Sequence, residues 1–257
     1  MTAQQVIDQI KAKLASINIA WRATTVDTFK AGSPDTEVTG IATTGMATFD
    51  LLKRAAAARC NFVIAHEPTF YNHLDETTTL ESDPVYLAKQ KFIKDNNMIV
   101  FRFHDHAHML PPDPLVIGSA RALGLTQYAQ ANPRNYVIPE TTLRQLASTL
   151  AARVGGKAIR VAGDPDMKVT RITLGPGSGV PALNDTYDVS IGGETNEAGG
   201  NAVYAADSAE NGRPRGVILL GHMMSEDWGM REVGDWLKTF ITGVPIEWIP
   251  TGEPFSG

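Results

Sequence analysis

Hydrophobic residues recur along the chain in two patterns, and these patterns alternate. At the amino terminus, Val6, Ile7, Ile10 and Leu14 recur at the spacing of one helix face with polar residues between them, which predicts an amphipathic helix ending near Ser16. Short runs of consecutive apolar residues further along are typical of buried strands, and helical spacing returns between them. The expected strands are 37–43, 62–65, 98–103, 158–161, 168–174, 187–191 and 216–220, and the later helices are 47–60, 84–94, 112–124, 142–154, 197–208 and 225–240.

Strands that alternate with helices are typical of an α/β fold with a mostly parallel sheet covered by helices. The 257 residues, of which 43% are hydrophobic, suit one large domain or two intertwined α/β halves with a substantial core. A polar, proline-containing stretch at 129–134 indicates a boundary. We therefore expect a first α/β half at 1–130 and a second at 131–257 that includes an inserted α+β segment. The two chain ends can form one composite unit.

Composition and charge argue against several classes of protein. The net charge of −5 and the isoelectric point of about 5.7 provide no broad positive field, which disfavours nucleic acid as a partner. The single cysteine, Cys60, excludes an internal disulfide framework and a thiolate-rich zinc module, and we expect it in the core. The amino terminus lacks a continuous apolar signal-peptide core, and no stretch is long and apolar enough to cross a membrane. We expect a cytoplasmic protein.

Candidate chemistry gathers where the expected strands end. All six histidines fall at or just beyond strand ends, at positions His66, His73, His104, His106, His108 and His222. In open α/β sheets, ligand sites form at the carboxyl ends of strands, because loops converge there while the rest of the sheet is packed. The clustering therefore predicts a site built from imidazoles.

The first group, His66-Glu67-Pro68, ends the apolar strand at 62–65. Imidazole and carboxylate are ligands that suit zinc, manganese, iron or nickel, and neighbours at a strand end can reach two ions if the backbone leaves the pleat. An isolated pair of this kind also occurs as a histidine that caps a strand beside a solvated glutamate.

The second group, His104-Asp105-His106-Ala107-His108, follows the strand at 98–103. In an extended conformation its alternate residues place three imidazoles on one face. One imidazole would then be a ligand, another would orient it, and Asp105 would hold a ring nitrogen. The alternative is a solvent-exposed histidine-rich loop.

The third group runs from Gly221-His222 to Glu226 at the start of a helix, where residues four apart point to the same side. A glutamate in a first helical turn is also ordinary capping chemistry. Glu194 follows the strand at 187–191 and is either a further site residue or a turn carboxylate.

At these groups the sequence resembles the Nif-three-like dinuclear metal centre family. Its members carry a His-His-Pro motif after a strand, a histidine followed by aspartate after the next strand, a late glycine-rich turn, and a Gly-His-x-x-x-Glu motif before the final helix. The counterparts here are His66-Glu67-Pro68, the run 104–108, Gly175-Pro176-Gly177-Ser178-Gly179, and Gly221-His222 through Glu226. Two positions depart from the pattern, since Glu67 replaces the second histidine and His108 stands at the aspartate position. Asp105 is the alternative ligand.

The resemblance implies a duplicated α/β core with mostly parallel mixed sheets, a ring-shaped homohexamer, and two divalent ions per chain, whether zinc, iron, manganese or nickel. Some relatives are labelled as GTP cyclohydrolases and others as metal-binding proteins. We expect a metal-dependent hydrolase of a small nucleotide-like or phosphorylated substrate. The alternative is a non-catalytic metal-binding ring that serves as a scaffold or regulator.

The three groups, together with the motif positions that the resemblance implies, give the expected site. The metal ligands are His66, Glu67, His108, His222 and Glu226, with Glu226 as the bridging carboxylate. His104 and His106 are the catalytic candidates, as a general acid or as a donor that orients a ligand, because imidazole titrates near neutral pH.

Overall fold

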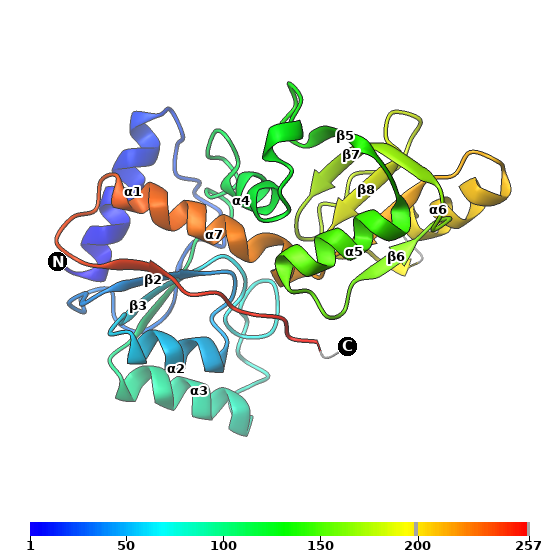
Figure 1. The fold of residues 1–257 in the computed structure, drawn as a ribbon. Coiled ribbons are helices and arrows are strands. Elements are labelled where there is room, and N and C mark those ends of the chain that lie inside the picture. Colours follow the sequence, from blue (N-terminus) through cyan, green and yellow to red (C-terminus); the bar gives the residue numbers. More distant parts are fainter. Residues whose placement is uncertain (198–199, 256–257) are drawn as a thin grey trace. The chain divides into compact units, whose positions relative to one another are not determined.

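Two five-stranded sheets form from the alternating pattern, one in each of two units of the chain. The computed structural model describes residues 1–197 and 200–255. Unit 1 contains Met1–Pro114 and Gly229–Thr251, and unit 2 contains Leu115–Trp228 and the chain from Gly252 onward. The expected α/β class is confirmed, and each unit is a sheet with helices beside it (Figure 1).

In unit 1 the strand order is β1-β4-β3-β2-β10. Strands β10, β2, β3 and β4 run parallel, and β1 pairs antiparallel with β4 at one edge. These strands are β1 (Phe29–Ala31), β2 (Ile41–Thr44), β3 (Phe62–Ala65), β4 (Ile99–Arg102) and β10 (Ile246–Trp248). All residues of β2, β3 and β4 are buried, as expected for parallel strands covered on both faces.

Successive strand residues point to opposite faces of the unit 1 sheet, so both faces carry buried side chains. Helices cover both faces. One face, with Ala42, Val63 and Val100, packs against α2 (Phe49–Ala57) and α3 (Pro84–Asp95). The other side carries α1 (Ala3–Ser16) and the later part of α7 (His222–Lys238), as Figure 1 shows. Gly234 permits the close approach of α7, because a Cβ there would lie 2.8 Å from Thr43 Oγ1.

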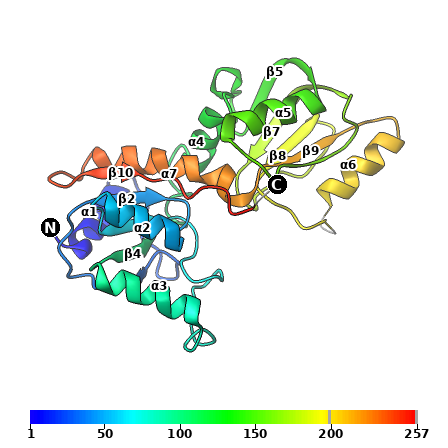
Figure 2. The same cartoon turned by 60° about the horizontal axis from the view of Figure 1, so that its bottom comes forward.

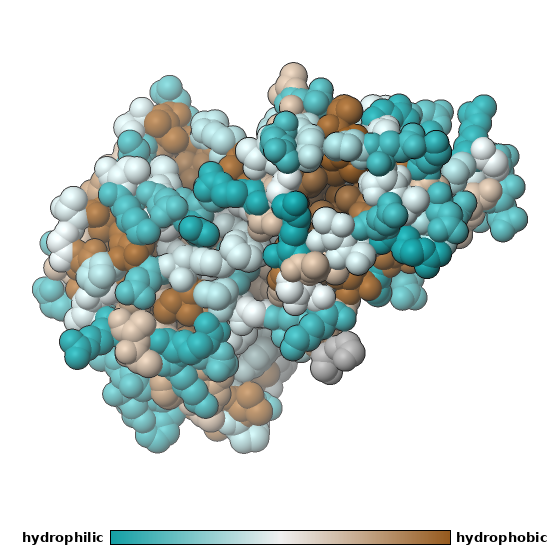
Figure 3. Space-filling view, in the orientation of Figure 1, coloured by the Kyte–Doolittle hydropathy of each residue, from teal (hydrophilic) through white to brown (hydrophobic). Residues whose placement is uncertain are grey.

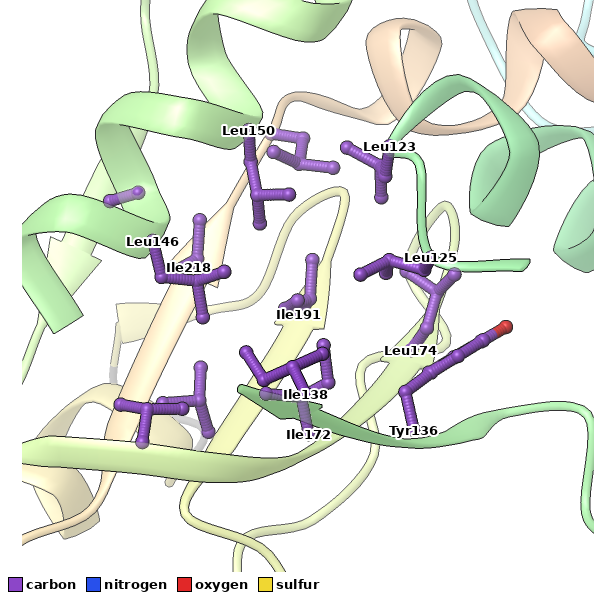
Figure 4. Close-up of a cluster of buried hydrophobic side chains, with 14 of the residues drawn as sticks. Leu123, Leu125, Tyr136, Ile138, Leu146, Leu150, Ile172, Leu174, Ile191 and Ile218 are labelled. Atoms are coloured by element: carbon purple, nitrogen blue, oxygen red, sulfur yellow. The ribbon is translucent and has the colours of Figure 1, made fainter. Parts of the chain in front are cut away.

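In unit 2 the strand order is β5-β7-β8-β9-β6. Strands β7, β8 and β9 are parallel, while β5 and β6 are antiparallel edges. The strands are β5 (Asn135–Thr142), β6 (Arg160–Ala162), β7 (Lys168–Gly175), β8 (Val189–Gly192) and β9 (Gly216–Leu219). One face buries Ile172, Ile191 and Ile218 against Leu146 and Leu150 of α5 (Leu143–Val154), and Figure 4 shows these side chains converging.

Two further helices and a short 3-10 segment complete unit 2. Leu123 and Leu125, which follow α4 (Pro114–Ala122) and precede the 3-10 segment Thr126–Tyr128, enter the α5 core (Figure 4). The opposite face carries α6 (Asn201–Glu210), which Figure 2 shows beside β9. Its Ala205 packs with Val217 and Leu219 of β9. The unit therefore buries both faces of its sheet.

The two units share the topology of one helix and four strands. In each, a helix and a short strand precede three parallel strands, and the short strand lies antiparallel beside the third of them. The counterparts are α1 and α5, β1 and β6, and β2-β3-β4 and β7-β8-β9. The expected duplicated core with mixed, mostly parallel sheets is thus present.

Strands β1, β5 and β10 were not expected from the sequence. Strands β1 and β10 have three residues each, too few for a periodic pattern, and β5 contains Pro139 and is partly exposed. Proline is tolerated there because β5 is an edge strand.

Among residues 1–197 and 200–255, no helix combines the length and apolar character needed to cross a membrane, and hydrophilic residues dominate the face seen in Figure 3.

Candidate metal centre

The carboxyl ends of β3 and β4 carry two of the three expected groups. The strands pair in register, with Ala65 opposite Arg102, so the segments that follow them leave the sheet at the same level. His66 and Glu67 follow β3 directly, and the segment 104–108 follows β4 after Phe103. Parallel pairing therefore places residues almost forty positions apart beside each other.

The segment 104–108, here called the histidine turn, is not extended as expected. Its backbone forms a helical turn, in which the His108 amide donates to the His104 carbonyl at 3.2 Å and the Met109 amide to the His106 carbonyl at 3.3 Å. Residues four apart lie on one side of such a turn. His104 and His108 therefore face each other, while His106 points elsewhere.

Three imidazoles meet at this point. The ring centroid of His66 lies 4.5 Å from that of His104 and 4.9 Å from that of His108, and the last two are 5.0 Å apart. One nitrogen of each ring lies within 4.8 Å of the others. Three imidazole nitrogens that converge in this way can hold one transition-metal ion and leave a coordination position for water.

The second nitrogen of each ring faces an oxygen. Nδ1 of His66 lies 3.2 Å from the Phe103 carbonyl, Nδ1 of His104 lies 2.9 Å from Asp105 Oδ1, and Nδ1 of His108 lies 3.2 Å from Asp113 Oδ2. An acceptor at Nδ1 favours the tautomer that carries its proton there. Each Nε2 then offers its lone pair, which is the form that a metal requires.

Asp105 orients His104 in this arrangement. Its carboxylate also accepts hydrogen bonds from Thr25 Oγ1 at 2.8 Å and the Val26 amide at 3.2 Å. Burial opposes the charge, but the hydrogen bonds from His104, Thr25 and Val26 outweigh it and lower the pKa of Asp105 to about 2. Of the two candidates, His108 rather than Asp105 joins the converging imidazoles.

Glu67 lies beside the three imidazoles but is held by an arginine. Its Oε2 is 3.3 Å from Nη2 of the fully buried Arg102, and its Oε1 is 3.8 Å from His104 Nε2. Arg102 also donates to the backbone carbonyls of His66, at 3.0 Å, and His73. This geometry suits Glu67 to bind a metal through one oxygen, Oε1, while the other remains with Arg102.

His106, expected as a catalytic candidate, lies in different surroundings. It is fully buried, its ring stacks on Trp21 with centroids 3.9 Å apart, and its Nδ1 lies 2.6 Å from Asp27 Oδ2. Its Nε2 accepts a hydrogen bond from the Arg22 amide at 3.0 Å. Both ring nitrogens are thus engaged by protein groups, which favours a structural role for His106.

Unit 2 carries the third group at the equivalent edge of its own sheet. The glycine turn Gly175–Gly179 begins at the last residue of β7, Glu194 follows β8, and His222 follows β9. His222 lies between two carboxylates, with Nδ1 at 2.8 Å from Glu194 Oε1 and Nε2 at 3.0 Å from Glu226 Oε2. Glu194 is therefore a partner of His222.

Gly177 explains why the turn after β7 is rich in glycine. A Cβ on Gly177 would lie 2.1 Å from Glu226 Oε1 and 3.1 Å from His222 Nε2, and its φ of +65° also favours glycine. The Gly177 amide donates to Ser225 Oγ at 2.8 Å, which fixes the turn against the first turn of α7. The turn packs against the candidate ligands, and this contact accounts for the glycine at position 177.

The comparisons with known proteins agree with the whole-chain resemblance. The family model Duf34/NIF3 (NGG1p interacting factor 3) matches residues 1–252. The chain belongs to the Duf34/NIF3 family. No curated protein matches it significantly.

Solved structures share the fold of this Duf34/NIF3 chain. A hypothetical protein of Staphylococcus aureus is 16% identical with a TM-score of 0.76, and the match covers 100% of this chain and 99% of that one. A Bacillus cereus protein related to NIF3 is 13% identical with a TM-score of 0.71, covering 99% and 98%. The protein ybgI, described as of unknown function, is 21% identical with a TM-score of 0.70, covering 99% and 100%.

Several residues that shape the Duf34/NIF3 site were not expected from the sequence. The sequence patterns assign no role to Asp113, Arg102 or Asp27. The roles of Asp27 and Arg102 come from contacts with distant segments, since these residues lie 79 and 35 positions from His106 and Glu67. Spacing within a motif carries no signal of such contacts.

Proposed function

We propose that this protein binds two divalent metal ions per chain and hydrolyses a small nucleotide-like or phosphorylated molecule. The observation that carries the proposal is the convergence of His66, His104 and His108 at the carboxyl ends of two parallel strands. Nitrogen and carboxylate ligands without a nearby thiolate suit zinc, iron, manganese or nickel.

We propose the ligand set that is expected from the sequence. His66, Glu67 and His108 come from unit 1, and His222 and Glu226 from unit 2, with Glu226 as the bridging carboxylate. The geometry of unit 1 adds His104 as a ligand or as the general acid. Bound divalent ions supply a water of lowered pKa and a clamp for a substrate oxygen. Asp105, Asp113 and Glu194 orient the imidazoles from their Nδ1 side.

The metal proposal is tested by elemental analysis of untagged protein. We expect close to two ions per chain in the wild type and a clear loss in His108→Ala. His73→Ala is the matched control. Its exposed ring lies edge-on to that of His104, with centroids 6.2 Å apart, but is not one of the three converging imidazoles, so this variant should keep the wild-type content. Substoichiometric metal that mild dialysis removes would contradict a dinuclear centre.

The hydrolase proposal is tested separately, with metal-loaded protein and a panel of nucleotides, phosphomonoesters and phosphodiesters. Activity should require the metal and should be abolished in His222→Ala. A fully loaded wild type that is inactive on the whole panel would contradict the hydrolase.

The family description favours a second candidate. The family is described as NGG1p interacting factor 3. A protein that acts by interacting with a partner would be a metal-binding scaffold or regulator without turnover. This candidate predicts saturated ligand shells with no exchangeable water, which water-proton relaxation of the Mn²⁺-loaded protein would reveal. Both candidates include the proposed ring-shaped homohexamer, for which light scattering should give about six times the chain mass of 27.7 kDa.

A further inference from the structure

The segment 22–27 lies far from the histidines in sequence, yet it makes the hydrogen bonds that shape the histidine turn. We propose that Asp27 is a positioning residue of the metal centre, which sets the relative placement of His104 and His108 without binding the metal itself. The inference rests on the proposed metal site and concerns only unit 1.

Asp27 is a buried carboxylate, with 2% of its surface exposed, and the histidine turn supplies four of its partners. Oδ1 accepts from the His104 amide at 2.7 Å and the Asp105 amide at 2.9 Å. Oδ2 accepts from the His106 amide at 2.9 Å and from Nδ1 of His106 at 2.6 Å. Three consecutive backbone amides therefore point at one side chain.

These hydrogen bonds determine the conformation of the turn. The first amides of a helical turn have no partner within it, and a carboxylate at that end satisfies them and stabilises the turn. When the amides of residues 104–106 are fixed on Asp27, the backbone cannot adopt the extended form that its sequence permits. The helical form is the one that brings His104 and His108 to the same side.

A second set of contacts fixes Asp27 and the turn together. The Asp27 amide donates to Thr25 Oγ1 at 3.1 Å, and Thr25 Oγ1 donates to Asp105 Oδ2 at 2.8 Å. His106 is clamped by the Arg22 amide and the stacked Trp21 ring. The buried His106 side chain therefore connects Trp21, Arg22 and Asp27 to the histidine turn.

The consequence is a metal site whose imidazoles are placed before the ion arrives. Preorganisation of this kind raises metal affinity because little conformational entropy of the ligands is lost when the ion binds. Removing a residue that orients ligands typically weakens metal binding by about 10-fold to 100-fold. We expect a loss in that range when Asp27 can no longer hold both pairs of donors.

The test is a Co²⁺ titration of Asp27→Asn, followed by the visible d–d absorption, which reports coordination geometry. Asparagine keeps the shape of the Asp27 side chain but replaces one acceptor oxygen by an NH₂ donor. That NH₂ group would face either the two donors of His106 or the amides of His104 and Asp105, and it could not accept their hydrogen bonds. The matched control is Asp188→Asn in unit 2. Asp188 is also buried and also accepts from two consecutive amides, Thr170 and Arg171, but it precedes β8, at the end opposite to Glu194.

We expect Asp27→Asn to bind Co²⁺ about 10-fold to 100-fold more weakly, with an altered absorption band, while Asp188→Asn keeps the wild-type Kd and spectrum. Circular dichroism establishes that each variant is folded. If Asp27→Asn does not fold, Thr25→Val weakens the same anchor from outside the turn and should shift the Kd in the same direction. A wild-type Kd and spectrum in the folded Asp27 or Thr25 variant would overturn the positioning role. A wild type that binds no Co²⁺ would instead refute the proposed metal site.

Discussion

Lys89 of α3 offers a sharp test of the electrostatics of a buried charge in unit 1. Its side chain is 2% exposed, and its Nζ donates to the Thr69 carbonyl at 2.6 Å and lies over the rings of Phe70 and Tyr71. Burial disfavours the charged ammonium more than the nearby Asp75 favours it, which lowers the pKa of Lys89 from 10.5 to about 8.

The sign and size of the effect follow from linkage. The folded pKa lies below the unfolded one, so between about pH 8 and 10.5 the unfolded chain binds more protons, and stability gains from rising pH. At about 1.4 kcal/mol per pKa unit, the shift corresponds to roughly 3 kcal/mol. Lys89→Met lacks this titration while keeping most of the apolar stem.

The assay is urea unfolding of wild type and Lys89→Met at several pH values from 7 to 10.5. The wild type should gain about 3 kcal/mol relative to the variant over this range. Burial raises the pKa of Cys60 to about 11 and that of Tyr136 to about 12, but these groups are present in both proteins and cancel in the difference. A difference that stays constant with pH, or that falls, would refute the reasoning.

Three further substitutions test the core, the glycine turn and a helix cap. Leu150→Ala empties part of the α5 core at a residue that is 1% exposed, and calorimetry should show a loss of about 2–5 kcal/mol; a loss below 1 kcal/mol would contradict the packing. Gly177→Ala should abolish metal binding at His222 and Glu226, whereas Gly212→Ala, with a similar φ of +67° but no neighbour within 4 Å, should keep it; equal metal content in both would contradict the contact. Thr142→Ala removes the capping box of α5 and should cost about 1 kcal/mol in urea unfolding, an effect that Thr142→Ser should largely restore.

Much of the fold could be predicted from the sequence because burial leaves a pattern along the chain. Strand β3 was expected at 62–65 and occurs there, and α3 begins at Pro84 as expected. The unexpected strands are short or half exposed, so their residues carry little pattern of their own. Their pairing depends on partners elsewhere in the chain, such as β4 for β1 and β2 for β10.

The site could be predicted only in part. Strand ends and residue types identified His66 and the histidine turn, and these do meet in unit 1. The expected extended run was wrong, because Asp27 supplies a capping carboxylate from a distant loop and makes the turn helical. His104 and His106 were expected on the same face. In the helical turn they lie on different sides, so only His104 joins the converging imidazoles.

The most direct test of the central claim is a crystal structure of the metal-loaded protein with anomalous data collected on both sides of the metal absorption edge. The account predicts an anomalous peak at about 2.0–2.1 Å from Nε2 of His66 and His108, the distance typical of zinc–imidazole bonds. A metal-loaded crystal with no anomalous peak among the imidazoles of His66, His104 and His108 would contradict it.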